Sequence, residues 1–206
     1  MSLETGHSIV IIDTETTGLG PEYEILQFSG IRATPSTVHA LDFKLQMRAC
    51  AKFTPEALRI NGYDPERAKT LPFMESKIDE IKLFCKANVG VVVGHNIDFD
   101  IAMLNGEIVR YGGRPLRSRR IDTMTLAHTL LSPRGLSSLS LKEVCKTLGV
   151  RNESEHSSLG DVKATALCYV KMMEMVWGKR GLAQAFPQLV RLSEFLQSNP
   201  KNATAP

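Results

Sequence analysis

The stretch that decides the fold lies near the amino terminus, where residues 9–18 read IVIIDTETTG. Four consecutive β-branched residues bounded by polar residues are typical of a buried central strand. The apolar run ends at Asp13, and a loop rich in Thr and Gly follows. Asp13 and Glu15 are two residues apart, so on a strand both side chains project from one face of the sheet. We therefore expect a buried strand that ends in two neighbouring carboxylates.

Two carboxylates at this spacing are, on their own, weak evidence of a metal site. Asp64 and Glu66 have the same spacing, but Pro65 between them predicts the start of a helix with Asp64 as its cap. Asp13 and Glu15 differ in position, because they end a strand and precede a loop that can bring backbone close to a ligand. Hard divalent cations bind such carboxylates. A solvated strand end is the alternative interpretation.

Two further strands are expected soon after the first. Residues 25–33 form a plausible second strand, and residues 41–47 alternate apolar and polar side chains with a period of two, which indicates a third strand with one wet face. Three strands at such close spacing favour an antiparallel meander. A fourth buried strand is expected over residues 89–93.

Helical patterns dominate the remainder of the chain. Capping residues before Pro55 and Pro65 predict two short helices, and apolar stripes predict helices over residues 74–85 and 101–111. Ser140 and Glu143 form a capping box that opens a helix closed by Gly149. A last core helix is expected over residues 162–178. We expect a domain over residues 1–180, followed over 181–206 by a peripheral helix at 182–196 and a frayed tail.

A second polar cluster follows the expected fourth strand, where residues 94–100 read GHNIDFD. Two aspartates compete for a role here. If Asp98 is the N-cap of the next helix, Asp100 lies in the first helical turn and faces back towards the strand end that carries Asp13. We therefore favour Asp100 as the metal-site residue.

A third polar cluster leads into the last core helix, where residues 155–161 read EHSSLGD. An isolated loop histidine is usually a surface residue, but His156 lies next to acidic residues. An imidazole with a pKa near 6.5 can accept a proton from water at neutral pH. Asp161, at the entrance to the helix, can supply another metal ligand.

The three clusters together resemble a known family. Asp13-x-Glu15-Thr16-Thr17-Gly18, then His95-Asn96-x-x-Phe99-Asp100, then His156-x-x-x-x-Asp161 resemble, in order and spacing, the DnaQ-like exonucleases of the DEDD superfamily, in the DEDDh subgroup with His in the third motif. The resemblance spans about residues 8–177. It implies an α/β, ribonuclease H-like fold: a five-stranded mixed sheet, with three antiparallel strands and then α/β units, flanked by helices.

The resemblance also implies roles for individual residues. Two divalent ions, Mg²⁺ or Mn²⁺, would be held by Asp13, Glu15, Asp100 and Asp161, with His156 as the general base. The residues expected to bind substrate are Thr16, Thr17, Gly18, Leu19, Asn61, Asn96 and Phe99. The chain departs from the common pattern at Asn61, where many relatives have His, and this departure weakens the case for sugar recognition there. Residues 25–30 resemble those of exonucleases specific for single-stranded DNA.

Composition and charge limit the possible classes of protein but do not identify a substrate. Lys and Arg exceed Asp and Glu by 25 to 22, a net charge of +3 that permits a polyanionic partner but does not require one.

Five arginines between residues 110 and 120 form either a basic loop for a phosphate backbone or a solvated loop. Asp122 resembles a polar residue near the active sites of this family, and we interpret it as a structural group or as one that supports the site ligands from behind. The four cysteines contain no C-x-x-C pair, and residues 1–7 have no secretion signal, so we expect free thiols, a cytoplasmic location and no membrane association.

The functional hypothesis is a metal-dependent 3′→5′ exonuclease that releases nucleoside 5′-monophosphates. Its expected partner is a nucleic acid with a free 3′ end, with single-stranded DNA favoured over RNA. The alternatives are an exoribonuclease similar to ribonuclease T or oligoribonuclease, and a proofreading subunit that partners a DNA polymerase. A catalytically silent nucleic-acid-binding protein on the same fold is the alternative of another class. Nucleoside triphosphate hydrolysis is disfavoured, because the chain lacks G-x-x-x-x-G-K-[ST].

Overall fold

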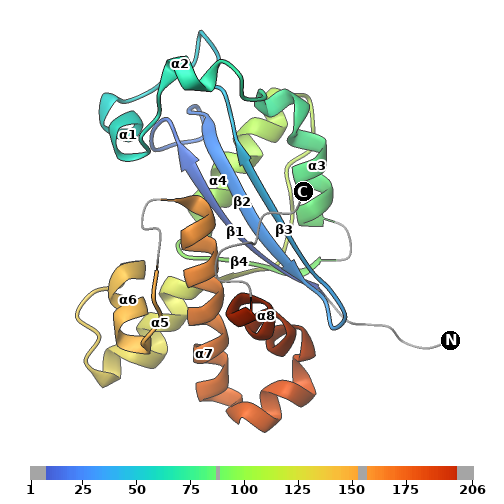
Figure 1. Ribbon diagram of the computed structural model, residues 1–206, viewed down its shortest axis with the longest axis vertical. Coiled ribbons are helices and arrows are strands. Elements are labelled where there is room, and N and C mark those ends of the chain that lie inside the picture. Colours follow the sequence, from blue (N-terminus) through green and yellow to red (C-terminus); the bar gives the residue numbers. More distant parts are fainter. Residues whose placement is uncertain (1–7, 87–88, 153–156, 199–206) are drawn as a thin grey trace, which may run out of the picture.

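A five-stranded mixed sheet forms the centre of the computed structural model, which describes residues 8–86, 89–152 and 157–198 (Figure 1). The strand order is β3-β2-β1-β4-β5. The strands are β1 (Ser8–Thr16), β2 (Ile25–Ala33), β3 (Val38–Lys44), β4 (Val89–Gly94) and β5 (Arg120–Asp122). The first three are antiparallel, whereas β4 pairs parallel with β1 and β5 pairs parallel with β4. This arrangement confirms the expected mixed sheet.

Strand β1 is central because its side chains are apolar on both faces. Val10 and Ile12 pack into one core cluster and Ile9 and Ile11 into another, and all four are at most 4% exposed. A strand covered by helices on both faces needs such a continuous apolar run. The β-branched sequence of residues 9–12 therefore places β1 in the middle of the sheet and its polar end, from Asp13, at the edge of the core.

Helices cover both faces of the sheet (Figure 1). Their bounds are α1 (Pro55–Ile60), α2 (Pro65–Ala68), the 3₁₀ turn η1 (Met74–Ser76), α3 (Ile78–Lys86), α4 (Ile97–Arg110), α5 (Thr123–Leu131), the 3₁₀ turn η2 (Ser132–Arg134), α6 (Leu141–Leu148), α7 (Ser158–Ala185) and α8 (Pro187–Ser198). Helices α3 and α4 pack on the face of Val10 and Ile12. Helices α7 and α8 pack on the face of Ile9 and Ile11.

Several helix starts agree with the capping signals. The Thr54 side chain accepts a hydrogen bond from the Ala57 amide at the start of α1, and Asp64 caps α2 in the same way. Ser140 caps α6 through the Glu143 amide, and Gly149 ends that helix in the left-handed conformation with a φ of 62°. These short polar side chains satisfy amide groups that have no partner within the helix.

Other boundaries differ from the predictions. The third strand starts and ends about three residues early, because Thr34 and Thr37 form a tight turn that pairs Val38 directly with Ala33. The helix expected over 74–85 is a 3₁₀ turn followed by α3. The helix expected over 182–196 is split, because α7 runs across a kink at Gly178 to Ala185, and α8 starts at Pro187. Proline has no amide hydrogen and fits the first position of a new helix.

The last helix completes the core on the α7 side of the sheet. Leu189, Leu192 and Leu196 of α8 are buried, and they join the cluster that contains Ile9 and Ile11. Burying three leucines contributes several kcal/mol, at about 1.5–3 kcal/mol each relative to full exposure. Among the described residues, no helix combines the length and the apolar character that a membrane span needs.

Candidate active site

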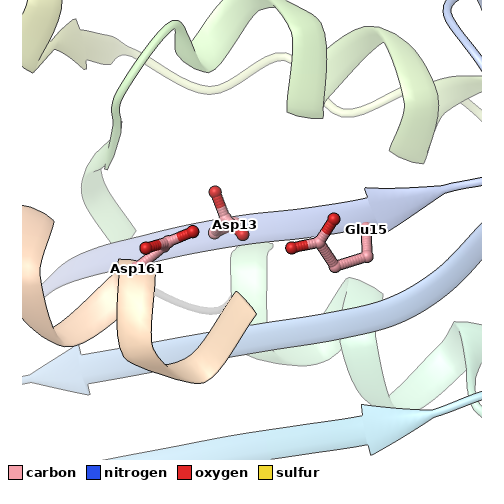
Figure 2. A group of neighbouring side chains, drawn as sticks. All are labelled: Asp13, Glu15 and Asp161. Carbon is pink, nitrogen blue, oxygen red and sulfur yellow. The ribbon is translucent and has the colours of Figure 1, made fainter. Parts of the chain in front are cut away.

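Three carboxylates meet at the polar end of β1. Asp13 and Glu15 lie on β1, and Asp161 lies in the first turn of α7; one oxygen from each lies within 4.8 Å of the other two. Figure 2 shows the three side chains gathered where the start of the helix meets the strand. The prediction that Asp13 and Glu15 share one face of the sheet is confirmed, and that face is the one covered by α7.

Two polar contacts hold α7 and its approach against the strand. The Ser158 hydroxyl donates a hydrogen bond of 2.7 Å to the backbone carbonyl of Asp13. The Asn152 side-chain amide donates one of 2.5 Å to Oδ1 of Asp161. Ser158 is fully buried, so its bond to β1 is shielded from water. Both contacts fix the position of Asp161 relative to Asp13.

Asp100 lies beside this group but on the other side of the strand. Its carboxylate is 3% exposed and accepts a hydrogen bond of 2.8 Å from the Thr14 hydroxyl. Thr14 alternates with Asp13 and Glu15 along β1 and therefore faces α4. Burial and the nearby Asp13 charge raise the pKa of Asp100 well above its usual range. Asp100 is thus electrostatically linked to Asp13, although it lies outside the group of three.

The start of α4 differs from the prediction. Asp98 is not the N-cap, because the helix begins at Ile97 and Asn96 occupies the cap position in the left-handed conformation, with a φ of 65°. The Asn96 amide donates to Oδ1 of Asp122 at 2.8 Å, which stabilises this tight turn. Asp98 is exposed and pairs with Arg120 at 2.7 Å. The turn after β4 therefore begins the helix two residues earlier than expected, and Asp100 still faces the strand end.

The crowded carboxylates bind protons more tightly than usual. The pKa of Asp13 rises to about 7, because the group is buried and lies near Asp161, although Ser158 opposes the rise. The pKa of Glu15 rises to about 8 through burial and the charges of Asp13 and Asp161. Burial and like charges both disfavour ionised carboxylates. A cation placed among them would lower these pKa values again.

The loop after β1 is held in place by hydrogen bonds, most of them to other segments of the chain. The Thr16 hydroxyl donates to the Gly18 carbonyl, and the Asn61 side chain donates to the Thr16 carbonyl, each at 2.8 Å. Thr17 is completely buried; its hydroxyl donates to the Lys52 carbonyl and accepts from the Glu24 amide. Thr17 and Asn61 therefore shape the loop through bonds within the protein.

Other predicted substrate residues differ in how accessible they are. Leu19 is 84% exposed at the tip of the loop. Gly18 allows close packing, since a Cβ there would lie 2.4 Å from the Tyr23 ring. Phe99 is half-buried and packs against the core on the α4 side of the sheet. Leu19 is thus accessible to a ligand, as is the exposed Asn96.

Two histidines belong to the sequence motifs. His156 lies outside the described residues, so its predicted role as a general base stays a prediction. His95 is half-buried, and its ring nitrogens contact the Thr123 hydroxyl at 3.0 Å and the Leu139 carbonyl at 2.8 Å. Burial lowers the pKa of His95. His95 therefore connects the end of β4 to α5 and to the chain before α6.

The sequence did not identify several residues that hold the carboxylates in place. Thr14, Ser158 and Asn152 each contact a carboxylate or its backbone, yet only their positions within or beside the motifs could have indicated this. Arg110 was grouped with a basic loop, but it forms a 2.5 Å salt bridge with Glu107 and donates to the carbonyls of residues 21–23. Asp122 caps α5 through the Met124 amide, which confirms its structural role.

Comparison with known proteins extends this description. A fold of this kind does not by itself fix a function. The sequence matches the family model RNase_T, described as Exonuclease, over residues 10–169. The chain belongs to this family of DnaQ-like, DEDD-type 3′→5′ exonucleases.

Individual relatives agree with this assignment. The chain is 27% identical over 181 residues to DNA polymerase III subunit epsilon of Aquifex aeolicus, covering 87% of each protein. It is 26% identical over 170 residues to DNA polymerase III PolC-type of Thermotoga maritima, covering 82% of this chain but 12% of that protein. Its fold is similar to that of E. coli Exonuclease I in complex with a dT13 oligonucleotide, with a TM-score of 0.70 and 21% identity; the match covers 94% of this chain and 44% of the other.

Proposed function

We propose that this chain hydrolyses nucleic acids from the 3′ end in a reaction that depends on Mg²⁺ or Mn²⁺, releasing nucleoside 5′-monophosphates. The observation that carries the proposal is the convergence of Asp13, Glu15 and Asp161 at the end of β1, with Asp100 buried beside them. Carboxylates from two distant segments of the sequence meet there, and burial together with their mutual repulsion raises their proton affinity. The excess of negative charge at this point favours the binding of cations.

The donor set fits a hard divalent cation. All of the converging groups are carboxylates, and oxygen-rich sites favour Mg²⁺ and Mn²⁺ over metals that prefer nitrogen or sulfur ligands. In our proposal Asp13, Glu15, Asp100 and Asp161 together hold two ions. Bound ions would supply Lewis-acid activation of water and neutralise charge on the phosphate and the leaving 3′ oxygen.

The protein side chains have their own parts in the proposed reaction. His156 accepts the proton of the attacking water, because a neutral imidazole is available at pH 7. Leu19, exposed at the tip of the loop, and Phe99 pack against the terminal nucleotide. The hydrogen bonds from Ser158 and Asn152 keep α7 and Asp161 in position during the reaction.

Single-stranded DNA is the substrate we favour, with RNA as the alternative. The fold similarity to a nuclease crystallised with a dT13 oligonucleotide supports DNA as the substrate.

The similarity to polymerase III epsilon subunits supports a DNA polymerase as a partner and a cytoplasmic location. We assign catalysis to residues 1–180, with α8 packed against that domain. A silent binding protein is disfavoured, because none of the motif carboxylates is replaced.

The test uses DNA and RNA oligonucleotides, single- and double-stranded, labelled at the 5′ or the 3′ end, with Mg²⁺, Mn²⁺ or EDTA. We expect 5′-labelled single-stranded DNA to shorten stepwise and 3′-labelled DNA to release labelled mononucleotide at once, in both cases only with metal. Asp13→Asn should abolish both signals. Shortening from the 5′ end, internal cuts, or tight binding without cleavage would each overturn the proposal.

A further inference from the structure

A large groove lies at the end of the sheet opposite the carboxylates. Its volume is about 1430 Å³, and its lining includes Ile9 near the start of β1, Val91 in the first half of β4 and Ile121 on β5. These three strands are parallel, so their amino ends meet at one edge, and the groove follows that edge. Tyr169 of α7 lies on its wall. We call this feature the amino-end groove.

The amino-end groove is strongly cationic. Its described lining contains no Asp or Glu but includes five basic side chains: Lys82, Arg114, Arg117, Arg119 and Arg120. Lys82 pairs with Asp79 and Arg120 with Asp98. Within the described part of the chain, no ion pair involves the other three arginines, and all three are exposed. A chain with a net charge of only +3 therefore concentrates uncompensated positive charge at one place.

The chemistry of this lining favours phosphate. Guanidinium groups present several donors in a planar fork that matches phosphate oxygens, and exposed arginines on one loop can contact successive phosphates. The described lining contains two aromatic rings: Tyr169 is 3% exposed, and Phe186 packs edge-on against Trp177 at 5.3 Å, whereas the arginines are exposed to solvent. Binding there would therefore act through the backbone and be independent of base sequence.

The groove lies within reach of a strand held at the carboxylates. Ile9 and Asp13 project from the same face of β1, and α7 runs from Asp161 past Tyr169 to Met173, which also lines the groove. Eight to twelve helical residues at 1.5 Å each span about 12–18 Å. At about 3.4 Å per stacked nucleotide, this distance corresponds to about four to five nucleotides.

We propose that the amino-end groove binds the phosphate backbone of a single-stranded nucleic acid, about four to five nucleotides and more from the 3′ end under cleavage. This inference rests on the proposed function, because an exonuclease acts on one terminal nucleotide and the remaining strand must leave the site. The carboxylate cluster repels that strand, and the arginines attract it. An acidic peptide would satisfy the same charges, but the position of the groove along α7 favours the strand.

The test compares substrates of different length. Arg114, Arg117 and Arg119 are replaced together by Gln, and KM and kcat are measured on a trinucleotide and a 20-nucleotide strand of single-stranded DNA. We expect KM for the long strand to rise about tenfold or more, with kcat unchanged and the KM of the trinucleotide within about twofold. The salt dependence of binding should weaken by about two units of log–log slope, since each lost single-strand contact removes about 0.7.

A control variant removes the same charge elsewhere. Arg67, Arg134 and Arg180 are exposed outside the groove, and their replacement by Gln should leave the length dependence intact. If both triple variants raise KM equally, the effect is general electrostatics and the groove is not a specific site. Unchanged KM on long strands in the groove variant would also overturn the proposal, and binding of an acidic peptide there would then identify the other class of partner.

A second measurement separates this inference from the proposed function. Binding of the 20-nucleotide strand is measured by fluorescence anisotropy with EDTA present, so no cleavage is needed. If the wild-type protein binds and the groove variant binds at least about tenfold more weakly, the groove assignment stands even where cleavage fails. If cleavage succeeds but the two proteins bind equally, the groove assignment alone is wrong.

Discussion

The Thr14 hydroxyl donates a hydrogen bond of 2.8 Å to Oδ1 of Asp100 and so connects the central strand to α4 across 86 residues of sequence. Thr14 faces α4, whereas its neighbours Asp13 and Glu15 face α7. The strand end therefore has acidic groups on both sides, three in one group and one held by Thr14. This bond orients the Asp100 carboxylate and makes it distinct from Asp98.

Replacing these two aspartates should give opposite results. Asp100→Asn should abolish cleavage, since it removes one of the four carboxylates proposed to hold the ions. Asp98→Asn should retain most activity, because Asp98 is 80% exposed and its ion pair with Arg120 is a surface pair worth at most about 1 kcal/mol. Turnover of single-stranded DNA at saturating Mg²⁺ compares them. If Asp98→Asn were the inactive variant, the motif register used for the site would be wrong.

His156→Ala should lower turnover about 10²-fold or more while leaving metal affinity nearly intact, because the change removes proton transfer and no ligand. The exposed His128 on α5 supplies the matched control, and His128→Ala should behave as wild type. Calorimetric titration of Mn²⁺ alongside kcat distinguishes the two roles. Loss of metal binding in His156→Ala would make His156 a ligand rather than a base.

The metal-free protein should lose stability as the pH rises from about 4 to 8. Asp13 and Glu15 have pKa values of about 7 and 8 in the folded protein, so there they hold protons that the unfolded chain has already released. The free energy of unfolding therefore falls across this window and is lowest above it. Denaturant titrations in EDTA at pH 5 and pH 8 measure the change. The double variant Asp13→Asn, Glu15→Gln should show much less of this loss, and an identical loss would contradict the assignment.

Leu19→Ala should weaken substrate binding without weakening the fold. The side chain is 84% exposed, so its removal should change stability by less than about 0.5 kcal/mol. Its contact with the terminal nucleotide should raise KM about tenfold with little change in kcat. Leu83→Ala, at a position 67% exposed on α3, is the control. An unchanged KM for Leu19→Ala would exclude this leucine from the substrate site.

Much of the fold could be predicted from local patterns. The run at residues 9–12 predicts the central strand because continuous β-branched residues are typical of a strand buried on both faces. Capping residues located the starts of α1, α2 and α6. The start of α4 was misplaced, because the left-handed turn at Asn96 depends on a hydrogen bond to Asp122, 26 residues away, which no local pattern reveals.

The candidate site was predictable in its residue types and less so in its geometry. Spacing placed Asp13 and Glu15 on one face, and the group formed with Asp161 agrees with this. The contacts of Thr14, Ser158 and Asn152 depend on how α4 and α7 pack on the sheet, which is set by apolar side chains elsewhere. Arg110 could not be distinguished from the arginines after it, because its burial by the loop at residues 21–23 is a tertiary effect.

The central claim is that the carboxylate group binds the divalent ions, and the melting temperature with and without Mn²⁺ tests it most directly. Without ions the acidic groups repel one another, so Asp13→Asn should be at least as stable as wild type. At free Mn²⁺ one hundred times its dissociation constant, wild type should gain about 2.7 kcal/mol, a rise of about 2–4 °C per kcal/mol.

Asp79→Asn, at a position 90% exposed on α3, is the control and should gain as much as wild type. The account predicts a large Mn²⁺ shift in the melting temperature of wild type and of Asp79→Asn, and a much smaller shift in Asp13→Asn. Equal Mn²⁺ shifts in wild type and Asp13→Asn, or no shift in wild type, would contradict it.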